Sequence, residues 1–254
     1  MFPLKPPKPS SIAKGNIGEK NEVRLIRTLI SLNGKYIKSL GLIVKEIADY
    51  SGREFSSEPE KAIIAKAPIF AKRDVLINGK GYSLKTISGS PPAIVNHTTR
   101  EKWLRVCKSI GLNIDLLDEM VEDYWNLRNN RKITEDVTTS NSLCPFGNTP
   151  SRKQYLKSLI EYFLFDGSGT RDSLHPADYV LEFFDPKDPT TWRVLDRQTV
   201  FLHQWPKMIF SLRSKKGMPP KYPDIDPAKK RLIEPWVRYT SNDYRGALHI
   251  RTRR

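Results

Sequence analysis

Between positions 73 and 90 the chain alternates apolar and polar residues around an Asn-Gly pair, RDVLINGKGYSLKTISGS. Strict alternation is typical of a β-strand with one buried face, and Asn-Gly tolerates the positive φ angles of a two-residue turn. The stretch therefore predicts a β-hairpin that turns at Asn78-Gly79 or, one residue later, at Gly79-Lys80. Because side chains alternate between faces, both registers put Asp74, Ser83 and Lys85 on one face. The other face then carries the apolar set, Val75, Ile77, Tyr82 and Leu84.

Elsewhere, apolar residues at helical spacing predict five helices, at 18–32, 58–66, from about 98, at 115–128 and at 150–165. Short β-rich runs predict strands at 43–47, 178–184 and 192–195, with weaker elements at 198–202 and 208–212. Helices and strands are mixed along the chain, which predicts an α/β fold.

The charge of the chain points to a polyanionic partner. Its 254 residues include 43 Lys and Arg against 28 Asp and Glu, a net charge of +15. Residues 205–254 hold thirteen of these bases and four acids, a net +9. Such an excess favours a nucleic acid, with an anionic membrane surface as the weaker alternative. No apolar run approaches the ~20 residues of a membrane span, so we expect no membrane insertion.

Composition also suggests an organisation along the chain. Residues 1–14 are rich in Pro and Lys and are expected to form a basic extended arm, residues 15–212 a core with inserted helices, and residues 213–254 a basic region. The two cysteines, Cys107 and Cys144, have no Cys-x-x-Cys or Cys/His spacing. A zinc finger and a disulfide framework are thereby excluded, and a reducing cytoplasm is expected.

The polar face of the hairpin carries the candidate chemistry. Asp74 followed by Ser83-Leu84-Lys85 resembles the PD-(D/E)xK nuclease pattern, in which an acid precedes a hairpin and an acid-x-Lys lies on its return strand. In that pattern a carboxylate and the main-chain carbonyl before the lysine, here that of Leu84, hold Mg²⁺, and the lysine orients the attacking water. Ser83 stands where the second acid belongs. Glu22 on the first predicted helix is the candidate for the missing carboxylate, with Glu19 second. Both acids also suit the first turn of a helix, where they favour its dipole.

Further stretches narrow the resemblance. The run GYSLKTISGSPPAIVN, the opening GNIGEKNEVRLIRTLISLNGKYI and the strand PADYVLEFF are similar to segments of the HpaII family of type II restriction endonucleases. The resemblance implies a restriction-endonuclease-like core, a mixed β-sheet flanked by helices, in a prokaryotic cytoplasmic enzyme. It implies Mg²⁺-dependent double-strand cleavage within a short DNA sequence, with Asp74 and Lys85 in the catalytic positions. It also implies that relatives share the serine at the Ser83 position and that a companion methyltransferase acts on the same DNA site. The sequence leaves a monomer and a homodimer open.

Residues outside the hairpin are candidates for DNA contacts. Asn96 can pair with a base edge, and His97 beside it can approach the cleft; both equally suit a loop or a helix cap. The arginines of the C-terminal region, of which Arg238, Arg245 and Arg251 are interleaved with aromatic residues, are expected to meet phosphates or guanine. Asp178 and Glu182 are expected to be solvated at the ends of their strand, with support of the metal ligands as the alternative.

Three functions remain open at this point. The first is a site-specific endonuclease. The second is a non-enzymatic nucleic-acid-binding protein in which the hairpin is a scaffold with a polar outer face. The third is a repair or structure-specific nuclease with the same core. The charge supports all three, whereas the hairpin and the turn after it support only the nucleases.

Overall fold

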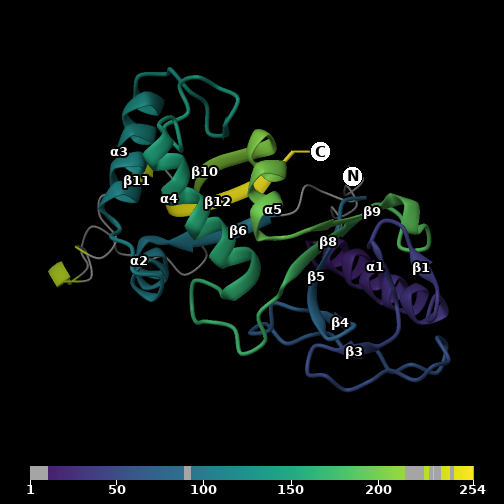
Figure 1. Cartoon of the computed structure of the whole chain (residues 1–254). Coiled ribbons are helices and arrows are strands. Elements are labelled where there is room, and N and C mark those ends of the chain that lie inside the picture. The colour runs from purple at the N-terminus through teal and green to yellow at the C-terminus, as the bar shows by residue number, and fades with distance from the viewer. Residues whose placement is uncertain are drawn as a thin grey trace, which may run out of the picture.

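The computed structural model describes residues 11–88, 93–214, 226–228, 231, 236–240 and 243–253. The chain forms a mixed α/β structure with two five-stranded sheets and a small two-stranded one. Figure 1 shows the two large sheets in separate lobes, with α1 on the first lobe and α2, α3 and α4 on the second.

The first sheet has the strand order β3-β4-β5-β8-β9. β5 and β8 run parallel, and every other neighbouring pair is antiparallel. The strands are β3 (Ile47–Asp49), β4 (Val75–Ile77), β5 (Lys80–Thr86), β8 (Tyr179–Phe183) and β9 (Trp192–Leu195).

The predicted hairpin is confirmed, and the structure decides its register. Ile77 lies opposite Lys80, so the turn is Asn78-Gly79. Asn78 has φ of 50° and Gly79 of 74°, the positive values that this tight turn requires. The Asn78 side chain also accepts hydrogen bonds from the backbone of Lys45 and Glu46, which fixes the turn to the preceding segment.

The two faces of this sheet enter different cores. Val75, Ile77, Tyr82 and Leu84 are buried against Leu25 and Leu29 of α1 (Ser11–Ser31), as the alternation predicted. On the opposite face, apolar side chains of β8 and β9 join the larger core of the second lobe, where they meet α5 (Arg197–Gln204). Helices therefore cover both faces of the first sheet, and polar residues on its second face lie between the lobes.

The second sheet has the order β11-β12-β10-β7, with β6 pairing with β12. Its strands are β6 (Ala93–Thr99), β7 (Val137–Thr138), β10 (Met208–Ser214), β11 (Arg238–Thr240) and β12 (Asp243–Thr252). It packs with α2 (Arg100–Ser109), α3 (Asp115–Asn129) and α4 (Pro150–Glu161) around the aromatic side chains Trp103, Tyr124, Phe146, Phe165, Phe210 and Trp236. The remaining elements are β1 (Tyr36–Ile37), β2 (Leu42–Ile43), the π-helix η1 (Tyr162–Asp166) and the 3₁₀ turns η2 (Pro189–Thr191) and η3 (Trp205–Lys207).

Several element predictions were wrong. The first helix begins at Ser11, so residues 11–14 are helical rather than part of an extended arm; residues 1–10 lie outside the described part. The predicted helix 58–66 is a single turn closed at Glu58, because so short a segment needs packing to be helical and Ile63 is 81% exposed. The predicted strand 43–47 is divided between β2 and β3. β6 was expected to be a turn leading into a helix; it forms a strand by pairing with β12.

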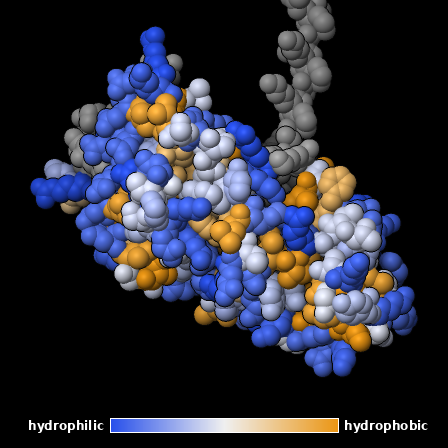
Figure 2. All heavy atoms as spheres, turned by 45° about the horizontal axis from the view of Figure 1, so that its top comes forward, coloured by the Kyte–Doolittle hydropathy of each residue, from blue (hydrophilic) through white to orange (hydrophobic). Residues whose placement is uncertain are grey.

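Figure 2 shows one face of the elongated molecule, on which hydrophobic side chains form separate patches among hydrophilic ones. Within the described residues, no helix combines the length and the apolar character needed to cross a membrane.

Candidate active site

The site begins at the open end of the hairpin, where β4 starts and β5 continues. Asp74 Oδ2 accepts a hydrogen bond from the backbone N–H of Leu84 at 2.7 Å and lies 3.5 Å from Ser83 Oγ. The Asp74 carboxylate thus accepts a hydrogen bond from β5 that the main-chain carbonyl of a further β4 residue would accept in a regular antiparallel pair. Because the N–H and C=O of a strand residue point the same way, the carbonyl of Leu84 faces the same edge as Asp74. One carboxylate and one main-chain oxygen are thereby brought to one spot.

Lys85 lies in a row of charges across three strands. In the sheet register it stands beside Glu182 of β8, and Glu182 stands beside Arg193 of β9. Glu182 is only 6% exposed, so the expectation of a solvated strand end was wrong for this residue. Its carboxylate accepts a hydrogen bond from Gln204 Nε2 and lies 3.4 Å from His203 Nε2. A buried acid therefore flanks the candidate catalytic lysine.

Glu22 approaches the same edge of the sheet from α1. It lines a cavity of about 380 Å³ together with Asp74 and Leu84. Burial, reinforced by the charge of Asp74, raises the pKa of Glu22 to about 7, while Lys85 opposes the rise. The structure thus brings Glu22 toward Asp74. Of the two predictions for Glu22, the missing carboxylate and an acid in the first turn of a helix, this position fits the first. Glu19, the second candidate, forms an ion pair with Lys66.

Asp74 and Lys72 share a second cavity, of about 190 Å³, with Ser83 and Lys85. Burial raises the pKa of Asp74, and Lys85 and the Leu84 N–H oppose that rise. Burial and the charge of Lys85 lower the pKa of Lys72 to about 8. Lys72 Nζ donates to the Phe163 carbonyl of η1 at 2.6 Å, which holds this ammonium beside the polar face of the hairpin.

The donor set suits Mg²⁺ better than a metal that prefers nitrogen or sulfur. Two carboxylates, Asp74 and Glu22, and the Leu84 carbonyl are hard oxygen ligands, and Mg²⁺ is commonly held by one or two carboxylates with water and substrate phosphate completing its shell. Over the described ranges no group of three or more His, Cys, Asp or Glu side chains is placed to hold a metal ion.

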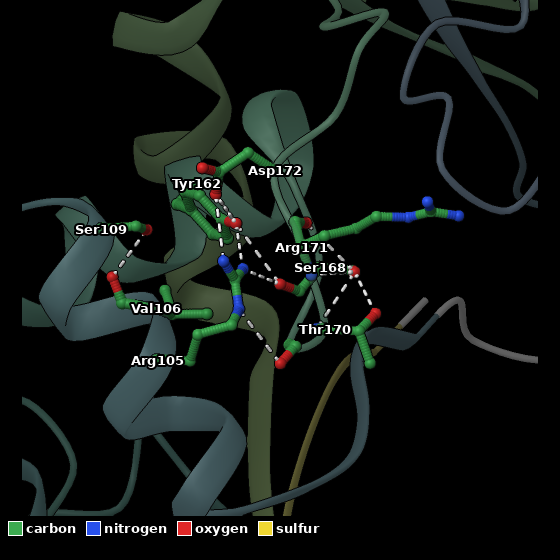
Figure 3. Close-up of polar contacts among 9 residues, drawn as sticks. Arg105, Val106, Ser109, Tyr162, Ser168, Thr170, Arg171 and Asp172 are labelled. Atoms are coloured by element: carbon green, nitrogen blue, oxygen red, sulfur yellow. Dashed lines mark hydrogen bonds and ion pairs between the residues drawn. The ribbon is translucent and has the colours of Figure 1, made fainter.

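A hydrogen-bonded loop supports the segment before Asp74. Arg105 of α2 donates to the carbonyls of Ser168 and Gly169 and pairs with Asp172 at 3.2 Å, and Tyr162 Oη donates to the same carboxylate at 2.6 Å (Figure 3). Further along the loop, Ser173 Oγ donates to the Phe70 carbonyl and accepts from the Lys72 N–H. The loop thus connects α2 to the residues that lead into the site.

We expect Tyr162→Phe to loosen this loop without unfolding the protein. The hydroxyl donates to Asp172 and accepts from Arg105, and removing it leaves the half-buried Arg105 one partner short while the exposed Asp172 is solvated, a cost of roughly 0.5–1.5 kcal/mol. Thermal unfolding should shift down by a few degrees, and limited proteolysis should cut within residues 167–172 faster than in the parent. Unchanged unfolding and unchanged proteolysis would show that the network does not hold the loop.

The predicted DNA contacts near β6 lie on the second sheet. Asn96 is exposed, whereas His97 is half-buried, has φ of 43° and packs edge-to-face on His249 with ring centroids 4.8 Å apart. His97 Nδ1 also lies 3.1 Å from the Ser214 carbonyl. Asn96 therefore presents its side chain to solvent, and His97 joins β6 to β10 and β12.

The predicted C-terminal arginines lie on β11 and β12. Arg245 Nη1 pairs with Glu135 at 2.5 Å, and Arg251 pairs with Asp136. Arg238 Nη1 donates to the carbonyl of Val237 at 3.0 Å. Glu135 and Asp136, just before β7, therefore pair with two of the arginines assigned to DNA. Their role in DNA contact stays a prediction.

Sequence reasoning missed Lys72, Gln204 and His203 as neighbours of the site. Lys72 carried a usable signal, since it stands two residues before Asp74 and strand alternation puts both on one side. Gln204 and His203 carried none, because α5 meets Glu182 only through the packing of the two lobes.

The chain matches no family model, no curated protein and no solved structure. The account of its function therefore depends on the geometry of the site.

Proposed function

We propose that the protein is a Mg²⁺-dependent endonuclease that cleaves double-stranded DNA within a short recognition sequence, as type II restriction enzymes do. The observation that carries the proposal is the grouping of Asp74, the Leu84 carbonyl and Lys85 at one end of a hairpin, with Glu22 facing them. The mixed sheet with helices on both faces agrees with the restriction-endonuclease-like core that the sequence resemblance implied.

Each residue has a distinct task in the proposed reaction. Asp74 and Glu22 would hold a Mg²⁺ ion, with Asp74 fixed in orientation by the Leu84 N–H. When bound, the ion would supply charge neutralisation at the scissile phosphate and a more acidic water. Lys85 orients the attacking water, and the buried Glu182 stands beside it in the sheet. Ser83, 2% exposed, donates toward Asp74 and does not replace the second acid.

Lys72 adds a second cation on the same side. Its position in the cavity of Asp74 and Lys85 lets it meet a phosphate oxygen on which negative charge develops in the transition state. Its hydrogen bond to the Phe163 carbonyl holds the ammonium before DNA arrives, so little reorganisation accompanies the reaction.

Plasmid cleavage tests the proposal against its two alternatives. We expect the protein with Mg²⁺ to convert supercoiled plasmid into discrete linear fragments, and EDTA to stop the reaction. A smear or nicked circles would indicate the repair or structure-specific nuclease. DNA binding without cleavage at any Mg²⁺ concentration would favour the non-enzymatic binding protein.

A further inference from the structure

A second group of cations lies next to the candidate active site, across Glu182. It lines a cavity of about 490 Å³ to which Glu182, Arg193, His203 and Lys207 contribute. Glu182, Gln204 and Thr252 also line the smaller cavity that contains Asp74 and Lys85, so the two cavities share one wall. The two cavities therefore lie next to each other.

Two of the cations that line this cavity, Arg193 and Lys207, converge on one imidazole, and Arg253 is a third cation in its lining. Arg193 Nη1 and Lys207 Nζ each lie 3.1 Å from His203 Nε2, although a ring nitrogen has a single lone pair. Glu182 is the carboxylate that faces this imidazole, and its other oxygen is engaged by Gln204. The positive charges of Arg193 and Lys207 therefore have one acid beside them in the lining of this cavity, Glu182, which also lies beside Lys85 in the sheet.

The burial of His203 and the charges around it favour the binding of an anion. Burial lowers the pKa of His203, and the charges of Lys207 and Arg193 lower it further against the opposite effect of Glu182. Arg193 is exposed and Lys207 half-buried, so both ammonium and guanidinium groups reach the cavity from its rim. Arg presents a planar fork of donors to phosphate, and Lys adds a point charge.

We propose that Arg193 and Lys207, positioned by His203, form a binding subsite for a backbone phosphate of the DNA strand next to the one at Lys85. The inference depends on the proposed function for the identity of the polyanion. The row Lys85, Glu182, Arg193 across the sheet sets the direction in which the strand runs, from the hairpin toward β9 and α5. The contact contributes affinity and register rather than sequence recognition.

The test is the salt dependence of DNA binding by the Arg193→Gln/Lys207→Gln protein. Binding of a fluorescent duplex is measured by anisotropy in EDTA, where the proposed cleavage is stopped, from 50 to 300 mM KCl. Each phosphate contact contributes about −0.9 to the slope of log K against log salt, so loss of this one contact should make the slope shallower by roughly 1. Affinity at the lowest salt should fall about tenfold or more.

The matched control is Arg131→Gln/Lys132→Gln, which removes the same two charges at exposed positions after α3 and outside both cavities. It should keep the parent slope. A scan of duplexes with single neutral methylphosphonate linkages then locates the contact, because one linkage that weakens parent binding should have no effect on the Arg193/Lys207 variant. If the double variant does not fold, Lys207→Gln alone carries the test with an expected slope change of about 1.

The outcomes separate the subsite from the proposed function. A parent slope in the double variant overturns the subsite, even if Mg²⁺-dependent cleavage is intact. A shallower slope in a protein that never cuts DNA supports the subsite and overturns the nuclease. A parent that does not bind duplex DNA overturns both.

Discussion

Lys85→Ala protein is expected to cut DNA at least about 10³-fold more slowly than the parent while it still binds the substrate. The ammonium lies on the same face as Asp74, and positioned acid–base groups typically contribute 10²–10⁴-fold. The measurement is single-turnover cleavage of a plasmid at saturating protein and Mg²⁺. Asp74→Asn should be at least as impaired, because the amide keeps the shape of the carboxylate and removes its charge toward the cation.

Lys80→Ala is the matched control for this experiment. Lys80 also lies on β5, but it is exposed at the turn and lines neither of the cavities beside Asp74. It should cleave at the parent rate. If Lys85→Ala or Asp74→Asn cuts as fast as Lys80→Ala, the hairpin is a scaffold and the active site lies elsewhere.

Glu22→Gln has the second largest expected effect, on the Mg²⁺ requirement and on its pH dependence. With a pKa of about 7, Glu22 is half protonated at neutral pH in the absence of a cation, so Mg²⁺ must displace a proton. The Mg²⁺ concentration for half-maximal cleavage should therefore fall as pH rises from 6 to 8 in the parent. In the Glu22→Gln protein this Mg²⁺ concentration should be at least about tenfold higher than in the parent at pH 8, and it should be nearly independent of pH. A parent-like Mg²⁺ requirement in the variant would remove Glu22 from the metal site.

The raised pKa of Glu22 also predicts how the stability of the folded protein depends on pH. The folded pKa of about 7 exceeds the ordinary 4.5, so the folded protein keeps a proton that the unfolded chain releases. The contribution of Glu22 is complete below pH 4.5 and is lost as pH rises through 7, by at most roughly 3 kcal/mol. In EDTA at pH 8, Glu22→Gln should thus unfold at a higher temperature than the parent, and Mg²⁺ should reduce the difference.

Local patterns predicted the hairpin and its neighbours well because local interactions specify them. The sequence around Asn78-Gly79 located the turn to within one residue, and alternation separated Asp74, Ser83 and Lys85 from the apolar face. The helix predicted from residue 150 begins at Pro150, where Thr149 Oγ1 accepts from the Arg152 N–H. In each case the signal and the structure lie within a few residues of each other.

Long-range pairing produced the features that the sequence did not reveal. β6 follows a proline-rich stretch of sequence and becomes a strand through its pairing with β12, which is far away along the chain. Residues 58–66 have the composition of a helix start, but they pack only through Ala62 and Ile64 and leave Ile63 exposed. Glu182 reads as a strand-end acid, and only the parallel pairing of β5 with β8 puts it beside Lys85.

Counting charged residues gives the net charge of the C-terminal region but does not show which of these charges are paired with one another. Counting residues could not show that Glu135 and Asp136 pair with Arg213, Arg245 and Arg251. Three cations line a cavity next to the candidate site, Arg193 of β9, Lys207 of η3 and Arg253 after β12. Predicting a polyanion-binding surface from charge therefore requires the positions of the acidic residues as well as those of the basic residues.

Sequencing the ends of fragments cut from phage DNA tests the central proposal most directly. With Mg²⁺ the parent should produce fragments whose ends all share one short sequence, whereas EDTA or Lys85→Ala should leave the DNA intact. Ends without a common sequence would contradict sequence-specific cleavage, and intact DNA with the parent protein over the full range of Mg²⁺ concentrations would contradict the nuclease itself.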